Sequence, residues 1–447
     1  MEGKHVVVIG GGSCRMKNFW QDAESYGIKV IHVESDPNHF ARDLVHGFIE
    51  YDFTDHSRDQ MHAENIINTI HGMGMKIDGC ISFIDVLIPL VGLICDSLEL
   101  RGLSYNSAII ALSKSQTQNV LSMNINEDDA SNAGVFSSKA VHLQSDSDCE
   151  MLPESFKFPA ILKLDNGAGG VGACMINSKE EMKKQFQHIT SSLCSDLVYP
   201  GIGLGRGNSM TTFEFHCGTE HNVDVILYDK TLVWASITDS GLVRQPYYIG
   251  TAKRLPSYLP DDSRRKLIDA AFKCCLGIGL TDGTFNVEFI ITANGPKLVE
   301  INPRMCGYIF RDWIMKLYGI DIMLYTMMIS CGIKPEIPNI TTGTIQMGVM
   351  VIPSFHGKLL TDDYHRNKLS EMIDRGEVLF LQFDSVEHPP TNKEPSLGPL
   401  STFEEPFGNV SVSGTNPIEV KRKLMEICRA LDIDQNDYQV DTFIINF

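Results

Sequence analysis

The chain has 447 residues, a hydrophobic content of 43% and a formal net charge of −18 at pH 7. This length allows a large hydrophobic core divided among several structural units. Because DNA and RNA are polyanions, so acidic a chain argues against nucleic-acid binding. Any phosphate-binding site must therefore gather its cations locally.

The cysteines and the hydropathy pattern predict a cytoplasmic protein without a membrane span. None of the 12 cysteines forms a C-x-x-C pair, so neither a zinc knuckle nor a thioredoxin-type site is indicated. The N-terminus leads directly into the apolar run Val6–Ile9, without the features of a signal peptide. The longest apolar stretch, residues 80–95, is interrupted by Asp85 and Pro89 and is too short to cross a bilayer.

Residues 1–112 alternate short apolar runs with amphipathic stretches, which predicts a parallel sheet with helices on its faces. Strands are predicted at residues 6–9, 30–33 and 77–83, and a helix at residues 18–26. A glycine-rich turn, residues 10–13, follows the first strand, where a nucleotide-binding loop would lie. The dinucleotide fingerprint requires a third glycine where this chain has Arg15, so NAD binding is disfavoured. A tight turn that could hold a small anion is the preferred interpretation.

The pattern changes in the rest of the chain. Residues 123–136 are polar and are predicted to form an exposed loop. Mixed strands and hairpins are expected from residue 158 to about residue 340, with helical segments at residues 264–276 and 311–330. The tail after residue 344 is predicted to be β-rich and to end in one helix. Its N-cap would be Asn416, with a proline and an acid in the first turn.

A lysine and a glycine-rich loop follow an apolar strand in the middle of the chain. Lys163 closes the strand at residues 158–162, and the next residues include Gly167, Gly169, Gly170 and Gly172. Amides in a loop without side chains can approach phosphate oxygens closely, and a lysine at a buried strand end needs an anion. These features favour a phosphate-binding loop over a flexible hairpin with a solvated lysine. No Gly-Lys-Ser/Thr follows, so this is not a Walker loop.

Two apolar strands around the turn Asn294-Gly295 carry the strongest chemical indication in the chain. Alternation across the predicted hairpin puts four polar side chains on one face, namely Asn286, Glu288, Glu300 and Asn302. Val287, Phe289, Val299 and Ile301 would then face the core. Two carboxylates placed opposite each other repel unless one is protonated or a cation lies between them.

Oxygen-only ligands of this kind suit Mg²⁺ shared with a phosphate chain. Arg304, two residues beyond the second strand, adds a cation able to bind phosphate. The alternative is a solvated polar face in a slightly different register.

These features, in this order, resemble the ATP-grasp superfamily, and residues 214–335 are similar to the carnosine synthase-like amino-acid ligases. The runs that carry the resemblance are Glu214-Phe215, Gly218-Thr219-Glu220-His221-Asn222-Val223-Asp224, Cys274-Cys275-Leu276-Gly277, Asp282-Gly283-Thr284-Phe285-Asn286-Val287-Glu288, Glu300-Ile301-Asn302-Pro303-Arg304-Met305, Arg311-Asp312-Trp313-Ile314 and Leu317-Tyr318-Gly319-Ile320-Asp321. At the superfamily level the resemblance covers most of residues 80–420.

The resemblance implies an α/β and α+β multidomain ATP-grasp fold. It places a Rossmann-like parallel α/β domain at residues 1–112, an ATP-grasp domain at residues 113–338, and a β-rich domain that completes the site at residues 339–447. The small lobe, residues 113–205, and the large lobe, residues 206–338, would clasp ATP between them.

The resemblance also implies roles for single residues. ATP would be bound by Lys114, Lys163, the loop glycines, Glu214 at the adenine and Glu220 at the ribose. Mg²⁺ or Mn²⁺, expected as two ions, would be bound by Glu288, Glu300 and Asn302. The catalytic cations would be Lys163 and Arg304, and the residues assigned to the substrate are Arg304, Arg311 and Tyr248.

The implied reaction begins with attack of a substrate carboxylate on the γ-phosphate of ATP. The resulting acyl phosphate would then react with the amine of an amino acid, β-alanine and L-histidine being the first pair to consider. Residues 240–254 depart from the carnosine synthase pattern, and the long N-terminal region of the animal enzymes has no counterpart, so the substrates stay open. The expected partners are small-molecule amino acids, with neither nucleic acid nor membrane, and a homodimer is possible.

Three alternatives remain at this stage. One is a ligase with a different acceptor in specialised metabolism. Another is a non-catalytic ATP-binding protein of the same fold, against which the intact set of lysine, arginine and acidic residues argues. The third is a nicotinamide oxidoreductase, disfavoured by Arg15 and by the acidic hairpin.

Overall fold

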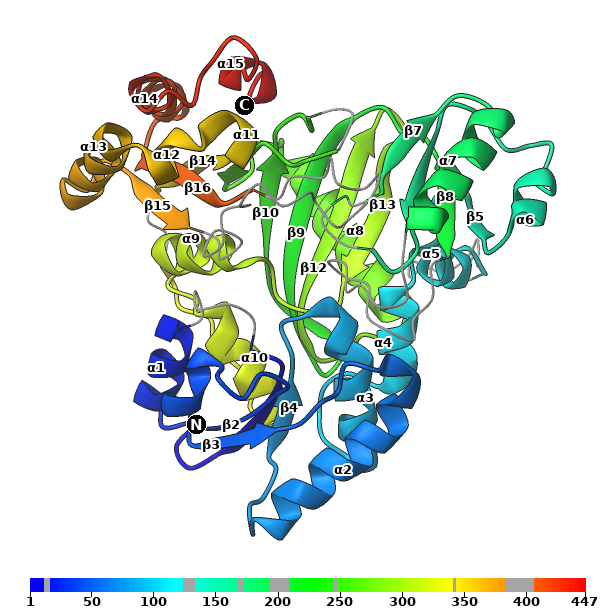
Figure 1. The fold of residues 1–447 in the computed structure, drawn as a ribbon, viewed down its shortest axis with the longest axis vertical. Helices are drawn as coiled ribbons and strands as arrows, with labels where there is room; N and C mark the ends of the chain where they lie inside the picture. The colour runs from blue at the N-terminus through cyan, green and yellow to red at the C-terminus, as the bar shows by residue number, and fades with distance from the viewer. Residues whose placement is uncertain are drawn as a thin grey trace.

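The computed structural model describes residues 1–11, 17–123, 133–167, 170, 172–192, 209–244, 248–340, 343–382 and 406–447. Three sheets form its framework (Figure 1). One has four parallel strands, one has four antiparallel strands, and the largest has eight antiparallel strands. The parallel sheet comes first in the chain, so the predicted order of an α/β unit followed by α+β units is confirmed.

The parallel sheet has the strand order β3-β2-β1-β4. Its strands are β1 (His5–Ile9), β2 (Lys29–Glu34), β3 (Gly47–Glu50) and β4 (Gly79–Ile81). Helix α1 (Lys17–Ser25) covers one face, and α2 (Asp59–Gly72) and α3 (Ile88–Ser97) cover the other. The predicted strands and the first helix are confirmed to within a few residues. The glycine turn begins at Gly10, whose φ is +71°, whereas residues 12–16 lie outside the described residues.

The small antiparallel sheet has the order β5-β8-β6-β7. Its strands are β5 (Ala140–Leu143), β6 (Ala160–Leu164), β7 (Cys174–Ile176) and β8 (Met210–Glu214), covered by α6 (Asp146–Glu150) and α7 (Lys179–Ser192). Because β8 pairs with both β5 and β6, the lobe boundary predicted at residues 205/206 falls one strand too early. Helices α4 (Tyr105–Leu112) and α5 (Lys114–Met123) precede this sheet.

The loop predicted at residues 123–136 is described only at its ends. Met123 is the last residue of α5, and residues 133–136 form a 3₁₀ turn, η5 (Ala133–Phe136). Residues 124–132 lie outside the described part of the chain.

The large sheet has the order β13-β12-β9-β10-β11-β14-β16-β15. Its strands are β9 (Thr219–Tyr228), β10 (Thr231–Ser240), β11 (Ala252–Leu255), β12 (Gly283–Thr292), β13 (Gly295–Asn302), β14 (Ile345–Val351), β15 (Leu379–Gln382) and β16 (Gly408–Gly414). Helix α8 (Asp261–Gly277) packs on the apolar face of β9, β12 and β13. The three C-terminal strands extend this sheet through the pairing of β11 with β14, so residues 339–447 share a sheet with the middle unit.

The C-terminal region is more helical than the sequence predicted. Besides its three strands it contains α11 (Pro353–His356), α12 (Lys358–Thr361), α13 (Asp363–Asp374), α14 (Pro417–Ala430) and α15 (Val440–Phe443). The prediction of a β-rich tail with a single helix is therefore wrong. The predicted start of α14 is confirmed, because the Asn416 side chain accepts hydrogen bonds from the amides of residues 418 and 419.

The helical segment predicted at residues 311–330 is two helices, α9 (Tyr308–Tyr318) and α10 (Ile322–Ser330). Gly319 ends α9 in the left-handed conformation, with φ +67°. The side chain of Asp321 then caps α10 by accepting from the amides of Met323 and Leu324. A continuous apolar pattern therefore concealed a break that a glycine and an aspartate produce together.

The N-terminal unit is joined to α9 and α10 by apolar packing and by a buried charge network. Asp321, which is 3% exposed, accepts from the Arg311 guanidinium at 2.6 and 3.0 Å and from the Tyr26 hydroxyl at 3.0 Å. Arg311 also donates to Asp22 on α1 at 2.6 Å, and its guanidinium lies over the ring of Phe19. Burial, followed by Asp321, raises the pKa of Tyr26 to about 12.

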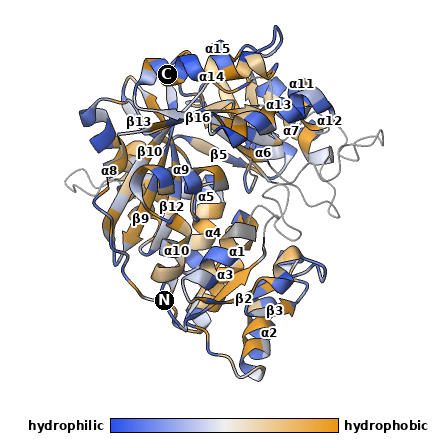
Figure 2. Ribbon diagram, turned by 90° about the vertical axis from the view of Figure 1, so that its left-hand side faces the viewer, coloured by the Kyte–Doolittle hydropathy of each residue, from blue (hydrophilic) through white to orange (hydrophobic). Residues whose placement is uncertain are grey.

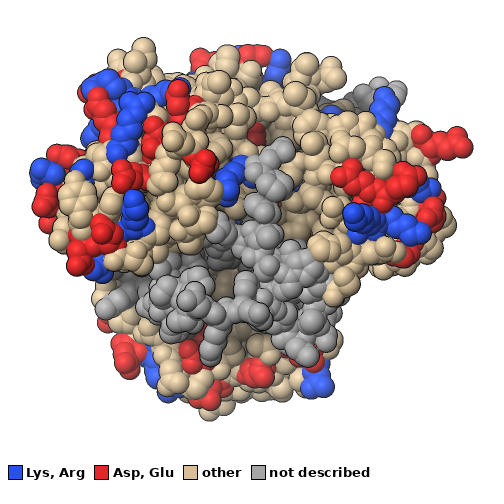
Figure 3. All heavy atoms as spheres, turned by 45° about the horizontal axis from the view of Figure 1, so that its top comes forward, with Lys and Arg blue, Asp and Glu red and all other residues tan. Residues whose placement is uncertain are grey.

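Apolar residues gather in the strands and on the inner faces of the helices (Figure 2). None of the helices in the described ranges is long and apolar enough to cross a membrane. On the face shown in Figure 3, described Lys and Arg side chains are interspersed with Asp and Glu, without an extended basic surface among them.

Asp321→Ala should lower the free energy of unfolding by about 3 kcal/mol, because it leaves buried Arg311 with half of its ion-pair partners. Urea unfolding followed by circular dichroism measures the change. The matched control is Asp269→Ala, which removes the acid of a half-exposed pair with Lys273 and should cost about 0–1 kcal/mol. Equal effects of the two substitutions would contradict the structural role given to this network.

Candidate functional site

The four polar residues of the β12–β13 hairpin meet on one face of the large sheet. Glu288 lies opposite Glu300, and Asn286 lies opposite Asn302, so the predicted register is confirmed. A β-bulge follows this pair, because Phe289 faces Leu298 and Val299 has no partner of its own. Val299 consequently lines a cavity instead of the core, and its predicted core position is wrong.

The two facing carboxylates differ in pKa. Burial, followed by the nearby charge of Glu300, raises the pKa of Glu288 to about 7. Burial would raise the pKa of Glu300 as well, but Lys114 and Lys163 outweigh it and hold that pKa below its usual value. The Nζ atom of Lys114, the first residue of α5, lies 3.0 Å from the Glu300 carboxylate. In the protein alone, a lysine and a proton thus relieve the repulsion between the two acids.

A chain of side-chain amides holds this face in place. Asn302 Nδ2 donates to Asn286 Oδ1 at 3.2 Å and approaches Glu288 Oε1 at 3.4 Å. Asn286 Nδ2 in turn donates to Asp224 Oδ1 at 2.7 Å. Asp224 is 1% exposed, and burial raises its pKa to about 6. Alternation along β9 would have identified Asp224 as an acid on the polar face of its strand.

Arg304 lies beside these acids in a cavity that the N-terminal unit helps to form. Its guanidinium donates to Asp85 at 2.7 and 3.0 Å. The residues lining this Arg304 cavity include Asp85, Asn222, Lys253, Asn286, Glu288 and Asn302. Lys253 Nζ donates to Asn222 Oδ1 at 2.9 Å and lies 3.7 Å from Glu220.

Sequence reasoning missed Asp85 as a site residue. The residue begins the 3₁₀ turn η4 (Asp85–Leu87) after β4. The indication in the sequence is an acid that interrupts an otherwise apolar stretch, residues 80–95.

A second cavity, called the inter-sheet cavity below, lies between the small sheet and the large sheet. The residues that line it include Ile161, Lys163, Phe213, Glu214, Glu220, Leu242, Tyr248 and Val299. Predicted phosphate, adenine and ribose residues therefore share one cavity, with apolar side chains between them. Glu214 also lies 3.5 Å from Lys139.

The glycine loop begins at the end of β6. Lys114 Nζ donates to the Gly167 carbonyl at 2.5 Å, so one lysine contacts both the loop and Glu300. Gly170 and Gly172 have φ values of +80° and +67°, which glycine adopts without strain. Gly169 lies outside the described residues.

Tyr248 and Arg311, the other two residues predicted to contact substrate, do not line the Arg304 cavity. Tyr248 lines the inter-sheet cavity with a φ of +53°, and its buried hydroxyl has no hydrogen-bond partner among the described residues. Arg311 belongs to the network with Asp22 and Asp321 that joins α1 to α9. This position gives Arg311 a structural role in place of the predicted contact with substrate.

No protein-family model matches the chain. Over its full length the chain is 37% identical to carnosine synthase 1 from Homo sapiens, of which it spans 53%. The chain thus spans about half the length of the carnosine synthases that it matches. Alanine–anticapsin ligase from Bacillus amyloliquefaciens is 24% identical over 70% of the chain and 67% of that protein.

Solved structures share the fold across nearly the whole chain. The L-amino acid ligase from Bacillus licheniformis has a TM-score of 0.71 at 15% identity, covering 96% of this chain and 98% of its own. N5-carboxyaminoimidazole synthetase from Staphylococcus aureus, crystallised with ADP, has a TM-score of 0.68 at 16% identity, covering 96% and 97%. The fold is therefore the ATP-grasp fold, as predicted, and the whole of this chain is similar in sequence to about half of carnosine synthase 1.

Asp224→Asn should change how stability depends on pH. The pKa of Asp224 rises from 3.8 to about 6 on folding, so its favourable contribution is present below pH 3.8 and is lost as the pH rises through 6. The unfolding free energy of the wild type should therefore fall, relative to Asp224→Asn, between pH 4 and pH 6. Urea titrations across this range measure the difference, and a difference independent of pH would contradict the raised pKa of buried Asp224.

Proposed function

We propose that this chain, an ATP-grasp protein homologous to carnosine synthases over its whole length, is an ADP-forming carboxylate–amine ligase that joins two amino acids. The observation that carries the proposal is the group of Glu288, Glu300 and Asn302 between two cavities, one lined by Lys163, Glu214 and Glu220 and the other by Arg304. Since the chain spans about half of carnosine synthase 1, its substrates are part of the proposal.

The donor set fits magnesium or manganese. Two carboxylates and one amide provide only oxygen ligands, and the raised pKa of Glu288 marks a position where a cation would replace a proton. We propose that Glu288, Glu300 and Asn302 hold two such ions. When bound, the ions would neutralise charge on the β- and γ-phosphates of ATP.

The residues around the acids fit phosphoryl transfer. Lys163 lines the inter-sheet cavity with Glu214 and Glu220, where it would bind phosphate oxygens while the two acids contact the adenine and the ribose. Lys114 would shift from Glu300 toward the phosphates as the metal ions take over its role. The glycine loop would add backbone amides to the same phosphates.

The Arg304 cavity is where a carboxylate would be activated. Asp85 orients the guanidinium, which leaves it on the wall beside Lys253 and Glu288. Arg304 would bind the substrate carboxylate and steady the charge of the transferred phosphoryl group. The amine of the second amino acid would then displace phosphate, with positioning rather than covalent chemistry as the contribution of the protein.

Incubation with Mg-ATP and a panel of amino-acid pairs, beginning with β-alanine and L-histidine, should yield ADP and a new amide mass. Glu300→Ala should lower ADP formation by at least about 100-fold while leaving the circular dichroism spectrum unchanged. Glu180→Ala, at an exposed position on α7, is the matched control and should retain activity. Nucleotide binding without ADP formation for any pair would favour a non-catalytic ATP-binding protein instead.

Metal–nucleotide binding should release a proton from Glu288. With a pKa of about 7, this carboxyl is mostly protonated at pH 6 and must ionise to bind a cation. Calorimetric titration with Mg-ATP at pH 6, in buffers of different ionisation enthalpy, should report close to one proton more than the same titration at pH 8. Glu288→Gln should remove that difference. A difference that persists in Glu288→Gln would assign the proton to another group.

A further inference from the structure

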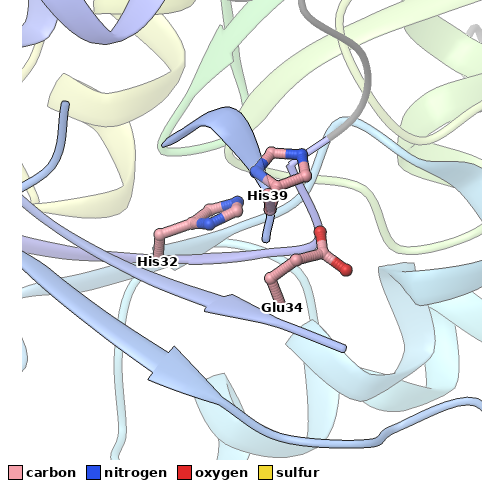
Figure 4. A group of neighbouring side chains, drawn as sticks. All are labelled: His32, Glu34 and His39. Atoms are coloured by element: carbon pink, nitrogen blue, oxygen red, sulfur yellow. The ribbon is translucent and has the colours of Figure 1, made fainter. Parts of the chain in front are cut away.

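A cluster of two histidines and a glutamate lies at the carboxyl end of β2, apart from the two cavities described above (Figure 4). His32 and Glu34 are two positions apart on the strand, so their side chains share a face. His39 reaches the same point from the turn that precedes the 3₁₀ helix η2 (Phe40–Asp43). One potential ligand atom from each of the three lies within 4.8 Å of the others.

His32 is the residue of this cluster whose ring nitrogens lack hydrogen-bond partners among the described residues. Its side chain is 0% exposed. The ring packs against Trp20 at 5.3 Å, His39 at 5.0 Å and Phe48 at 5.7 Å between centroids. The Gly10 backbone interacts with the imidazole, but not with the geometry of a hydrogen bond. A phenylalanine could fill this position without burying two polar atoms. Because a buried ring nitrogen without a hydrogen bond is costly, the imidazole is expected to bind a partner.

The surroundings orient the other two side chains. Glu34 Oε2 accepts from the Gly11 amide at 2.8 Å, and Oε1 accepts from the Ser35 amide at 2.7 Å. Such bonds to a carboxylate are what fixes a metal ligand in direction. The backbone of Gly11 lies against both rings, because a Cβ there would stand 2.3 Å from His39 Cε1 and 2.5 Å from His32 Nε2. Glycine is therefore the residue that lets the rings converge.

We propose that His32, Glu34 and His39 bind a divalent transition-metal ion of the zinc class. Two imidazoles and one carboxylate are a common zinc ligand set, with a fourth position left for water or another ligand. Imidazole nitrogen is a poor ligand for Mg²⁺, so this site and the acidic hairpin would select different ions.

The required movement is small. Ligand atoms around a tetrahedral zinc ion with bonds of 2.0–2.1 Å lie about 3.3 Å apart, so the three groups must close by about 1.5 Å at most. His39 Nδ1 accepts a long hydrogen bond, 3.3 Å, from the Ala41 amide, and this weak bond is what ion binding would exchange. The ion would then join β2 to the turn after β1 and to η2.

The test uses the full chain carrying Cys217→Ser, since Cys217 is an exposed thiol that could itself bind zinc. Metals are first removed with a chelator. Zn²⁺, added without nucleotide or substrate to buffer that contains excess Mg²⁺, should then bind at one equivalent per chain and raise the melting temperature of the protein. Co²⁺, used as the spectroscopic probe, should show d–d absorption without thiolate charge-transfer bands. Glu34→Gln and His32→Phe should each weaken Zn²⁺ binding by about 100-fold or more.

Two further variants define the site. His71→Asn, an exposed histidine on α2, should bind Zn²⁺ as the parent does. Glu300→Ala should also keep the tight equivalent, which separates this site from the acidic hairpin and from the proposed ligase activity. If His32→Phe fails to fold, Glu34→Gln and His39→Asn carry the test. Unchanged binding in Glu34→Gln, or loss of the equivalent in Glu300→Ala, would overturn the proposal.

Discussion

The arrangement of the site depends on the repulsion between two buried carboxylates that face each other across β12 and β13. Glu288 and Glu300 can lie opposite each other only because their charges are offset in different ways. The raised pKa of Glu288 favours its protonated form, whereas Glu300 forms an ion pair with Lys114. Lys114 starts α5, whose first turn is fixed by Asp165 of the small lobe through the Ser115 amide at 2.8 Å. The acidic pair of the large sheet therefore requires the small lobe to be docked in this position.

The same constraint links the glycine loop to the acidic face of the β12–β13 hairpin. Lys114 contacts the Gly167 carbonyl and Glu300 at once, so a cation at Glu300 would release a lysine that also holds the start of the loop. Nucleotide phosphate entering with the ions would offer that lysine a new partner. With the proposed ions bound, loop position and ion occupancy would therefore be coupled through the Lys114 side chain.

Alternation along strands was sufficient to predict the register of the hairpin, because its core face and polar face are each unambiguous in the sequence. The prediction failed for Val299 because a β-bulge changes the direction of this one side chain, while its neighbours stay on the predicted faces of the strand. The membership of β8 and of β14–β16 depends on pairing between segments far apart in the chain, which local patterns do not contain. Arg311 was assigned by position, but its acidic partners, Asp22 and Asp321, became apparent only once α1 was placed beside α9.

Asp85 and the His32 cluster were missed for a related reason. Asp85 and His32 are polar residues within apolar stretches of the N-terminal unit. The sequence alone does not distinguish a structural from a functional role for such a residue. Parallel strands carry the loops after their carboxyl ends to one edge of the sheet, and both Asp85, after β4, and Glu34, at the end of β2, lie at that edge. The Asp85 carboxylate meets an arginine there, whereas the imidazole of His32 meets no hydrogen-bonding group among the described residues. A polar side chain at a strand end becomes informative once its partner is known, and an unsatisfied buried imidazole is therefore the stronger evidence for a ligand that comes from outside the chain.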